Sequence, residues 1–352
     1  MDKERMKAFS QRVFGDMAAT MNTGLAYVGY KSGLFKAMDG KGPMTTEQVV
    51  QAAGLHPRYV EEWLKGMAAG GMLDYDPAAQ TFTLPPEHAY FLNSEGTDHF
   101  MAGVYLRAVS LLHVAPQVAD AFKSGGGVLF KDYPDDFHEI SDMMNRGAYE
   151  NRFVSYWMEQ MPETKARLEA GGARALDFGC GAGRVPITLG KAYPRSTFIG
   201  VDSHALSIKM ANELKQKEGA GDNVRFVNQR IDDFDADEPF DFISACDCIH
   251  DLEDPLGTLK KIRRLLKPEG VFFVIEPRVA DDLEQNLNPI ANMFYGISVF
   301  YCMTQSLAKG GPGLGTCYGQ RNMQQLMADA GFTRFEVLNI KSPVNIFYGV
   351  RP

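Results

Sequence analysis

The most constraining feature of the sequence is a glycine-rich turn that follows a short apolar segment. Residues Ala173–Phe178 predict a buried β-strand, and the chain then places Gly179, Gly181 and Gly183 at alternate positions before a helix expected from about Val185. Glycine lets the backbone bend sharply and approach a ligand, because no Cβ intervenes. The segment predicts either a nucleotide-type cradle or a tight strand-to-helix corner without a ligand.

An acidic residue in this turn indicates which ligand it suits. In a dinucleotide-binding turn, the third glycine lies three residues after the second and the loop faces a pyrophosphate. Arg184 occupies that position here. Asp177, two residues before Gly179, would repel a pyrophosphate but suits a ligand with an ammonium and a sulfonium group. S-adenosylmethionine carries both groups and is the expected cofactor.

Composition limits the class of protein and its partners. The chain has 352 residues, of which 45% are hydrophobic and 23% charged, as expected for a globular protein of two domains. Its net charge of -8 argues against a polyanion as the main partner. The charged segment Met1–Lys7 leads into no apolar run like the core of a secretory signal peptide. No stretch is long enough and apolar enough to span a bilayer. We therefore expect a cytoplasmic location and no membrane partner.

The cysteines predict neither disulfides nor a metal. The five cysteines are an odd number and include no Cys-x-x-Cys pair. Cys246 and Cys248 lie near His250, but their spacing on a strand end is a poor tetrahedral arrangement. They are expected to be core thiols.

The N-terminal region has the pattern of a long helix. Apolar residues recur at helical spacing along one stripe, at Phe9, Val13, Met17, Met21, Leu25 and Val28. A stripe of this length is typical of a surface that packs on a partner subunit, which favours a homodimer. An internal core helix is the alternative.

A winged-helix pattern follows. Residues 45–73 show helix-capping and turn signals typical of a helix-turn-helix, and residues 74–84 predict a hairpin. The second helix, residues 57–69, mixes both charges, at Arg58, Glu61, Glu62 and Lys65. Because DNA-binding helices are predominantly basic, this pattern favours dimerisation and a substrate lid over nucleic-acid binding.

The chain is expected to divide into three parts. Residues 1–94 form the winged-helix dimerisation domain, residues 95–165 a helical linker and lid, and residues 166–352 the cofactor-binding domain. Strand and helix patterns alternate through the last part and end in a hairpin. This order predicts an α/β fold, a doubly wound seven-stranded Rossmann-like sheet.

A second acid lies where a nucleoside would bind. Asp202 ends the expected second strand, where its carboxylate can accept both ribose hydroxyls of an adenosine. The alternative is that Asp202 caps the helix expected from Ala205.

Together these segments resemble a known family, the class I S-adenosylmethionine-dependent methyltransferases. The resemblance is to members with an N-terminal winged-helix dimerisation domain, such as the plant caffeate-type and bacterial phenazine-type O-methyltransferases. It rests on Leu176–Gly183, Gly200–Asp202, Ile249–Asp254, Leu266–Gly270 and Asp329–Phe332.

The resemblance implies roles for the cofactor-binding residues. The turn glycines and Asp177 hold the methionine end, and Asp202 holds the ribose. Where the family usually reads Gly-Asp-Ala for adenine contacts, this chain has Gln-Arg-Ile ending at Ile231. The backbone amide of Ile231 can still bind the adenine ring. The role of the family's acid, which binds the adenine amino group, would pass to Asp232. Asp247 is a further candidate beside the cofactor.

The resemblance also implies a catalytic base. His250 and Asp251 match the family's His-Asp pair, in which the histidine takes the proton of the acceptor hydroxyl. Glu276, or alternatively Asp247, orients the imidazole ring. A base contributes roughly 10²- to 10⁴-fold. The alternatives are that His250 caps the following helix and that catalysis works mainly by proximity.

The acceptor is expected to be small and largely apolar. An insertion at residues 278–313 is rich in aromatic and Met side chains, as acceptor-binding loops are. The candidate acceptor contacts are Tyr149, Asn292, Met293, Tyr295 and Phe300. The caffeate-type enzymes carry a second glutamate where this chain has Gly315–Gly319, so the acceptor atom is left open between O, S and N. A ligand-sensing transcription regulator is the alternative from another class.

Overall fold

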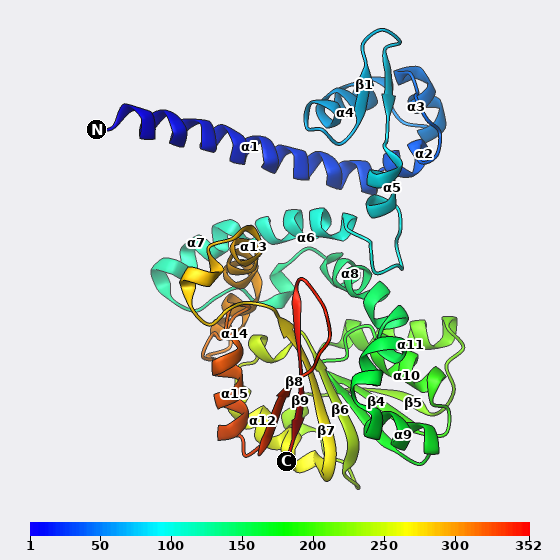
Figure 1. Ribbon diagram of the computed structural model, residues 1–352, viewed down its shortest axis with the longest axis vertical. Helices are drawn as coiled ribbons and strands as arrows, with labels where there is room; N and C mark the ends of the chain where they lie inside the picture. The colour runs from blue at the N-terminus through cyan, green and yellow to red at the C-terminus, as the bar shows by residue number, and fades with distance from the viewer. The chain divides into compact units, whose positions relative to one another are not determined.

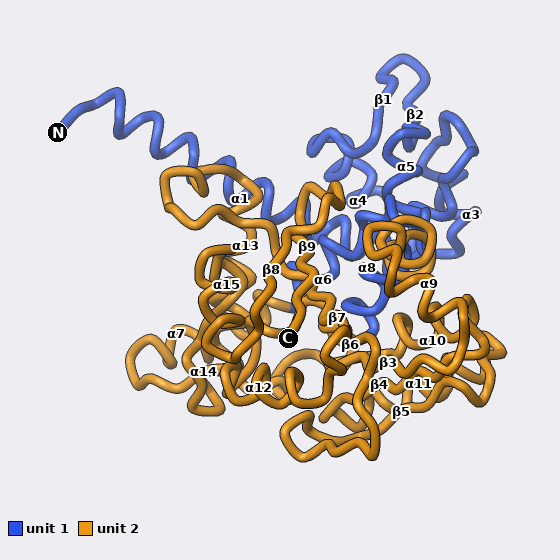
Figure 2. Tube along the Cα trace, turned by 60° about the horizontal axis from the view of Figure 1, so that its bottom comes forward, with its two compact units in different colours: residues 1–110, 139–147 blue, residues 111–138, 148–352 orange.

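The structure is a computed structural model that describes all 352 residues. The chain forms two compact units, which Figure 2 draws in different colours. Unit 1 comprises residues 1–110 and 139–147, and unit 2 comprises residues 111–138 and 148–352. No helix is both long enough and apolar enough to cross a membrane.

Unit 1 contains the predicted winged helix. Its elements are α1 (Lys3–Lys31), α2 (Leu34–Met38), α3 (Thr46–Ala53), α4 (Pro57–Ala69), β1 (Asp74–Asp76), β2 (Thr81–Thr83), α5 (Pro86–Leu92) and the start of α6 (Ala102–Leu112). Thr45 and Gln48 form a capping box that starts α3, and β1 pairs with β2 in an antiparallel hairpin. The predicted helix-turn-helix followed by a hairpin is therefore confirmed.

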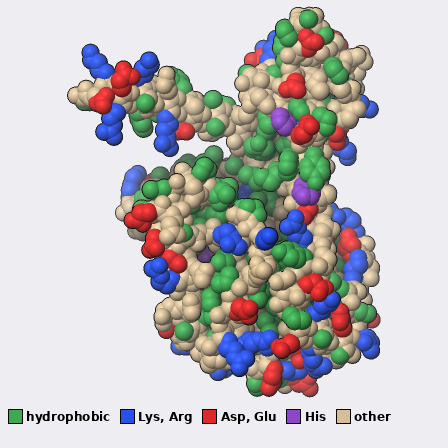
Figure 3. Space-filling model, in the orientation of Figure 1, with side chains coloured by type: hydrophobic (Ala, Val, Ile, Leu, Met, Phe, Trp, Pro, Cys, Tyr) green, Lys and Arg blue, Asp and Glu red, His purple; other side chains and the backbone are tan.

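The first helix, α1, leaves its predicted apolar stripe uncovered. Residues 1–21 are all exposed, including Phe9, Val13 and Met17. Figure 3 shows hydrophobic side chains along this helix, with Lys and Arg gathered toward its N-terminal end. Near its other end, Trp63 donates a hydrogen bond from Nε1 to the Leu25 carbonyl oxygen at 2.8 Å. Within unit 1, only the C-terminal part of α1 packs on the winged helix.

Unit 2 is built on a seven-stranded sheet of order β5-β4-β3-β6-β7-β9-β8. The strands are β3 (Arg174–Phe178), β4 (Thr197–Asp202), β5 (Val224–Asn228), β6 (Phe240–Cys246), β7 (Leu266–Pro277), β8 (Arg334–Val337) and β9 (Asn345–Arg351). The first five are parallel, and β9 runs antiparallel to both β7 and β8. The predicted doubly wound sheet with a closing hairpin is confirmed.

Helices cover both faces of this sheet (Figure 1). On one face lie α9 (Pro162–Ala170), α10 (Arg184–Ala192) and α11 (Ala205–Lys217); on the other lie α12 (Pro255–Leu265) and α15 (Gln320–Asp329). Alternate residues of each strand enter the two cores: Ala175 packs with the first set of helices and Leu176 with the second. This alternation is the period-two pattern of a sheet buried on both faces.

A smaller apolar cluster forms beside the sheet. It joins α7 (Ala115–Ser124) and the start of α8 (Phe137–Asn151) to a helical stretch made of α13 (Pro289–Ile297), a π-helix (Ser298–Cys302) and α14 (Met303–Ala308). Tyr133 donates a hydrogen bond from its hydroxyl to the Phe300 carbonyl oxygen at 2.5 Å. This cluster places the predicted acceptor-binding insertion next to residues 111–137.

Candidate active site

The glycine turn begins where β3 ends. Gly179, Gly181 and Gly183 have φ of 66°, 50° and 78°, the left-handed region that favours glycine. A Cβ on Gly183 would lie 2.5 Å from the Phe226 ring, whereas one on Gly181 would meet no atom within 4 Å. Gly183 is therefore required for packing, and the backbone at Gly181 borders open space that a ligand can approach.

Asp177 is a buried acid at this turn. Its side chain is 5% exposed, and its Oδ1 accepts a hydrogen bond from the Ser244 hydroxyl at 2.6 Å. Burial raises the pKa of Asp177 to about 7, although the Ser244 hydrogen bond acts in the opposite direction. A carboxylate in this position gains from a cationic ligand, since buried charges need a partner.

Asp202 holds the turn against the neighbouring strand. Its Oδ2 accepts a hydrogen bond from the Gly181 amide at 3.0 Å, and its Oδ1 accepts one from the His204 amide at 2.8 Å. The N-cap of α11 is His204, whose side chain accepts from the Ser207 amide. Asp202 is thus hydrogen-bonded to the backbone of the glycine turn, and it is not the N-cap of α11.

The two residues predicted to contact adenine lie after β5. Ile231 is buried at the start of a short 3₁₀ helix, Ile231–Asp233. Asp232 accepts hydrogen bonds from the Thr258 hydroxyl at 3.0 Å and from Arg230 at 3.1 Å. Its carboxylate already has two partners, so the role of Asp232 toward adenine stays a prediction.

Three aromatic rings gather beside Asp202, and sequence reasoning did not identify them. The His138 and His204 rings stack with their centroids 4.1 Å apart, and Phe130 meets His204 edge-on at 5.1 Å. Burial, with a smaller contribution from His204, lowers the pKa of His138 to about 4. His138 is therefore a neutral, stacked ring at physiological pH.

A histidine and a glutamate form a buried pair at the ends of β6 and β7. His250 lies in the 3₁₀ helix Ile249–Asp251 that follows β6, and its Nδ1 lies 2.5 Å from Glu276 Oε2. The other oxygen of Glu276 accepts a hydrogen bond from the Ile249 amide at 3.2 Å. The two side chains are 4% and 6% exposed. Glu276 therefore fixes the orientation of the His250 ring through Nδ1, and Nε2 takes no part in that contact.

The surroundings of His250 make it a strong base. Burial lowers the pKa of His250, but the carboxylates of Glu276 and Asp251 outweigh burial, so the pKa is raised well above its ordinary value. Asp251 Oδ1 lies 3.3 Å from Nε2. Helix α12 is capped by Asp254, which accepts from the Gly257 amide. His250 is thus held in place by acids and does not serve as that helix cap.

Asp247 and Tyr149 lie on the Asp177 side of the same strand ends. Asp247 has the unusual φ of 52° for a residue other than glycine, and its Oδ1 accepts a hydrogen bond from the side-chain Nδ2 of Asn345 at 3.1 Å. Tyr149, in α8, lies close enough to Cys246, Asp247 and Asp177 that, after burial, these groups raise its pKa well above the ordinary value. The structure therefore brings Tyr149, Asp177 and Asp247 into one region.

The other predicted acceptor contacts lie on the insertion. Met293 and Tyr295 are 39% and 40% exposed on α13, and Asn292 is exposed beside them. Phe300 is partly buried and packs on the cluster formed with residues 111–137. Their contact with an acceptor stays a prediction.

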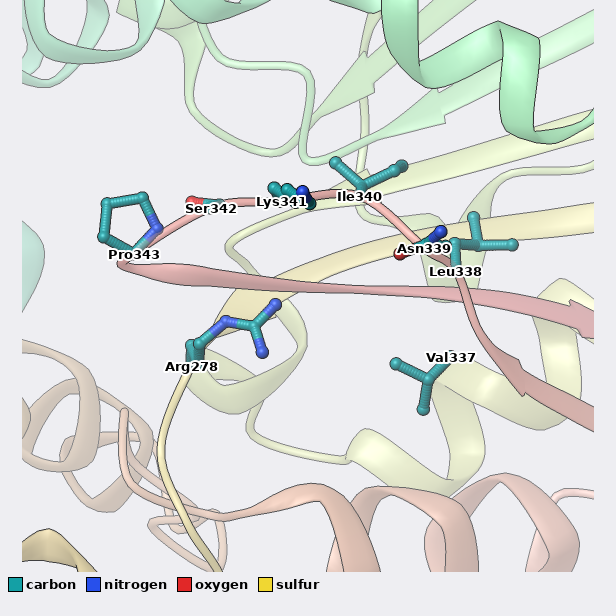
Figure 4. A pocket seen from close by; sticks show the side chains of 8 residues that line it. All are labelled: Arg278, Val337, Leu338, Asn339, Ile340, Lys341, Ser342 and Pro343. Carbon is teal, nitrogen blue, oxygen red and sulfur yellow. The ribbon is translucent and has the colours of Figure 1, made fainter.

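A shallow pocket of ≈ 610 Å³ lies next to the closing hairpin (Figure 4). It is lined by Arg278 and by residues 337–343, which connect β8 to β9. None of the predicted site residues lines it. The strand-end geometry of Asp177 and His250, rather than this pocket, therefore defines the candidate site.

Comparisons with known proteins agree with this geometry. Residues 169–331 match the family described as "Methyltransferase domain", and residues 20–94 match the "Rv2258c-like winged HTH domain". The chain joins a winged helix-turn-helix domain to a methyltransferase domain. The methyltransferase domain contains Asp177, Asp202, His250 and Glu276.

A stretch of the chain is also similar to part of a curated methyltransferase. The chain is 28% identical over 110 residues to a ubiquinone biosynthesis O-methyltransferase of Xanthomonas euvesicatoria, an alignment that covers 31% of this chain and 44% of that protein. The chain therefore spans less than half the length of this curated relative.

Solved structures share the complete fold. The mitomycin 7-O-methyltransferase MmcR superposes with a TM-score of 0.70 at 14% identity and covers 100% of both chains. Human N-acetylserotonin methyltransferase, solved in complex with SAM, superposes with a TM-score of 0.64 at 17% identity and covers 100% of this chain and 98% of its own. The predicted family resemblance is confirmed for the fold and for both domains.

Proposed function

We propose that this protein is an enzyme that transfers a methyl group from S-adenosylmethionine to a hydroxyl of a small, largely apolar molecule. The observation that carries the proposal is the placement of two groups at the carboxyl ends of β3, β6 and β7. Buried Asp177 suits a cationic ligand, and the His250–Glu276 pair supplies a base. Both the domain match and the shared fold support this assignment.

The cofactor cradle follows from the turn. Asp177 faces the ammonium end, the backbone at Gly181 approaches the ligand, and Asp202 and the Ile231 amide hold ribose and adenine. Asp232 and Asp247 border the same ligand. When bound, S-adenosylmethionine supplies an electrophilic methyl group next to a positively charged sulfur.

His250 prepares the acceptor. With S-adenosylmethionine bound, His250 Nε2 would take the proton of the acceptor hydroxyl as that oxygen receives the methyl group. Glu276 keeps Nδ1 protonated and stabilises the imidazolium that results. Tyr149 and Phe300, together with Asn292, Met293 and Tyr295 of α13, shape the acceptor site.

A screen with a labelled methyl donor tests the function. Phenols, thiols and amines are offered to the purified chain together with S-adenosylmethionine labelled in its methyl group, and labelled product is quantified. We expect transfer to a hydroxyl. Transfer restricted to a thiol or an amine would correct the acceptor atom, and cofactor binding without transfer to any acceptor would favour a ligand-sensing protein instead.

Cofactor affinity is expected to depend on pH through Asp177. Because its pKa is about 7 in the free protein, the carboxyl group is mostly neutral below that pH and loses its attraction for a cation. The Kd of S-adenosylhomocysteine, measured by calorimetry, should be roughly tenfold higher at pH 6 than at pH 8. Asp177→Asn should remove most of this difference. An equally steep dependence in that variant would assign it to another group.

We also propose that α1 joins two copies of the chain. Its exposed stripe contains Phe9, Val13 and Met17, and a second copy of the same helix covers such a stripe isologously. The 29 residues of α1 extend roughly 43 Å, long enough for a continuous helix pair.

Negative charges introduced on the exposed apolar stripe of α1 should dissociate the proposed dimer. The double variant Phe9→Glu, Met17→Glu places two like charges against their copies, so light scattering should report a monomer where the unmodified chain is a dimer. Gln11→Glu, an exposed change on the opposite side of α1, should leave the mass unchanged. A dimer that survives the double variant would move the interface elsewhere.

Small-molecule partners remain favoured over nucleic acid. The basic residues of α4 are Arg58 and Lys65, and both pair with acids of the same helix: Arg58 with Glu62, and Lys65 with Glu61 at 2.5 Å. A phosphate backbone would have to compete with these pairs. The cytoplasmic location stays a prediction from the sequence.

A further inference from the structure

Three potential metal ligands lie close together, and one of them is the proposed base. His250 Nε2, an Asp251 carboxylate oxygen and Cys302 Sγ all lie within 4.8 Å of one another. They come from two segments far apart in the sequence, the 3₁₀ helix after β6 and the π-helix Ser298–Cys302. Sequence reasoning considered Cys246 and Cys248 as ligands, but the structure brings Cys302 to His250 instead.

One separation within this group, that between His250 and Asp251, matches a tetrahedral metal site. Zn²⁺ binds nitrogen and carboxylate oxygen at roughly 2.0 to 2.2 Å, so two such ligands at a tetrahedral angle lie about 3.3 to 3.5 Å apart. His250 Nε2 and Asp251 Oδ1 are 3.3 Å apart. Little movement is needed for a metal to sit between them.

Two further features match a metal site. A metal-bound histidine commonly donates its other ring N–H to a carboxylate, and His250 Nδ1 already contacts Glu276 at 2.5 Å. Asp251 Oδ1 is buried and accepts no hydrogen bond within the protein, although it forms an ion pair with His250 Nε2 when that ring is protonated. Such an atom calls for an explanation, and a bound cation supplies one.

We propose that His250, Asp251 and Cys302 bind a zinc-class divalent cation, with the fourth position open to water. A thiolate with an imidazole and a carboxylate is a ligand set that suits Zn²⁺ and disfavours Mg²⁺ or Ca²⁺. Coordination replaces water ligands of the hydrated ion with Cys302 sulfur, His250 nitrogen and an Asp251 oxygen, and releases the thiol proton and any imidazolium proton to solvent.

The site has a consequence for the proposed methyl transfer, and that consequence rests on the proposed function. A metal on Nε2 uses the lone pair that would take the acceptor proton. Zinc therefore inhibits transfer to a hydroxyl, and a chelator restores it. Binding itself does not depend on the protein being a methyltransferase.

Cobalt spectroscopy tests the binding directly. The full-length chain, freed of metal with a chelator, is titrated with Co²⁺ and then with Zn²⁺. We expect one equivalent to produce tetrahedral Co²⁺ absorption and a thiolate-to-cobalt charge-transfer band, both of which Zn²⁺ abolishes. Binding without a charge-transfer band, or no binding, would overturn the proposal.

Variants identify the ligands. Cys302→Ser should remove the charge-transfer band, while Cys246→Ser, which alters another thiol of unit 2, should retain it. Glu276→Gln should weaken zinc binding by roughly 10- to 100-fold, as loss of a carboxylate partner does. Unchanged binding of S-adenosylhomocysteine to Cys302→Ser confirms that this variant is folded; a band that persists in it would overturn the assignment. Zinc binding by a chain that methylates no acceptor even after it is freed of metal would leave the site intact and reject only the proposed function.

Discussion

Replacement of His250 by alanine is expected to lower kcat/KM for methyl transfer by roughly 10²- to 10⁴-fold, which is the usual contribution of a general base. Affinity for S-adenosylmethionine should remain within a few fold, because Asp177 and Asp202, which we propose to hold the cofactor, lie at other strand ends. Single-turnover kinetics with a labelled methyl donor, combined with calorimetry, separates the two quantities.

Two companion variants distinguish a base from a structural role. His250→Gln keeps a side-chain donor for the buried Glu276 and should be as inactive as the alanine variant. Glu276→Gln removes the main charge that raises the pKa of His250, so the rise of kcat/KM with pH should move to lower pH. Near-normal turnover of His250→Ala at every pH would show that proximity alone drives the reaction.

Asp177→Asn is expected to weaken binding of S-adenosylmethionine by about 2 to 5 kcal/mol, roughly 30- to several-thousand-fold, the range for loss of one member of a desolvated charge pair. Asparagine keeps the size of the side chain and can still accept the Ser244 hydrogen bond. The loss is therefore assigned to charge. Calorimetry at pH 8, where the carboxyl group is ionised, gives the measurement.

Ser244→Ala provides the matched control. It removes one hydrogen bond to the carboxylate but leaves the charge, so it should cost about 0.5 to 1.5 kcal/mol of binding free energy. An Asp177→Asn variant that binds no more weakly than Ser244→Ala would mean that the carboxylate does not face the cation.

Much of the site was predictable because strand ends converge. The sheet alternates strands and helices, so the carboxyl ends of β3, β4, β6 and β7 lie at one edge. Asp177, Asp202 and Glu276 each fall near such an end, so their positions at one edge of the sheet could be predicted from the sequence, while their roles stay predictions. Ser244 was missed, although it pairs with Asp177 in the parallel register of β3 and β6. Correct pairing of the strands would have revealed it.

Contacts from outside the sheet were not predictable. Cys302 reaches His250 through a π-helix inside the insertion, and no periodic pattern fixes where such an irregular turn points its side chains. The stacking of His138 on His204 likewise joins α8 to the start of α11. Conversely, the apolar stripe of α1 was found readily from helical spacing, but spacing alone does not tell a core helix from an exposed one.

Calorimetry of the unmodified chain with S-adenosylmethionine and, separately, with NAD measures most directly whether a buried carboxylate beside the glycine turn selects a cationic adenosyl ligand. We expect one S-adenosylmethionine bound per chain, stronger at pH 8 than at pH 6, and no binding of NAD. Binding of NAD, or no binding of S-adenosylmethionine at either pH, would contradict the assignment.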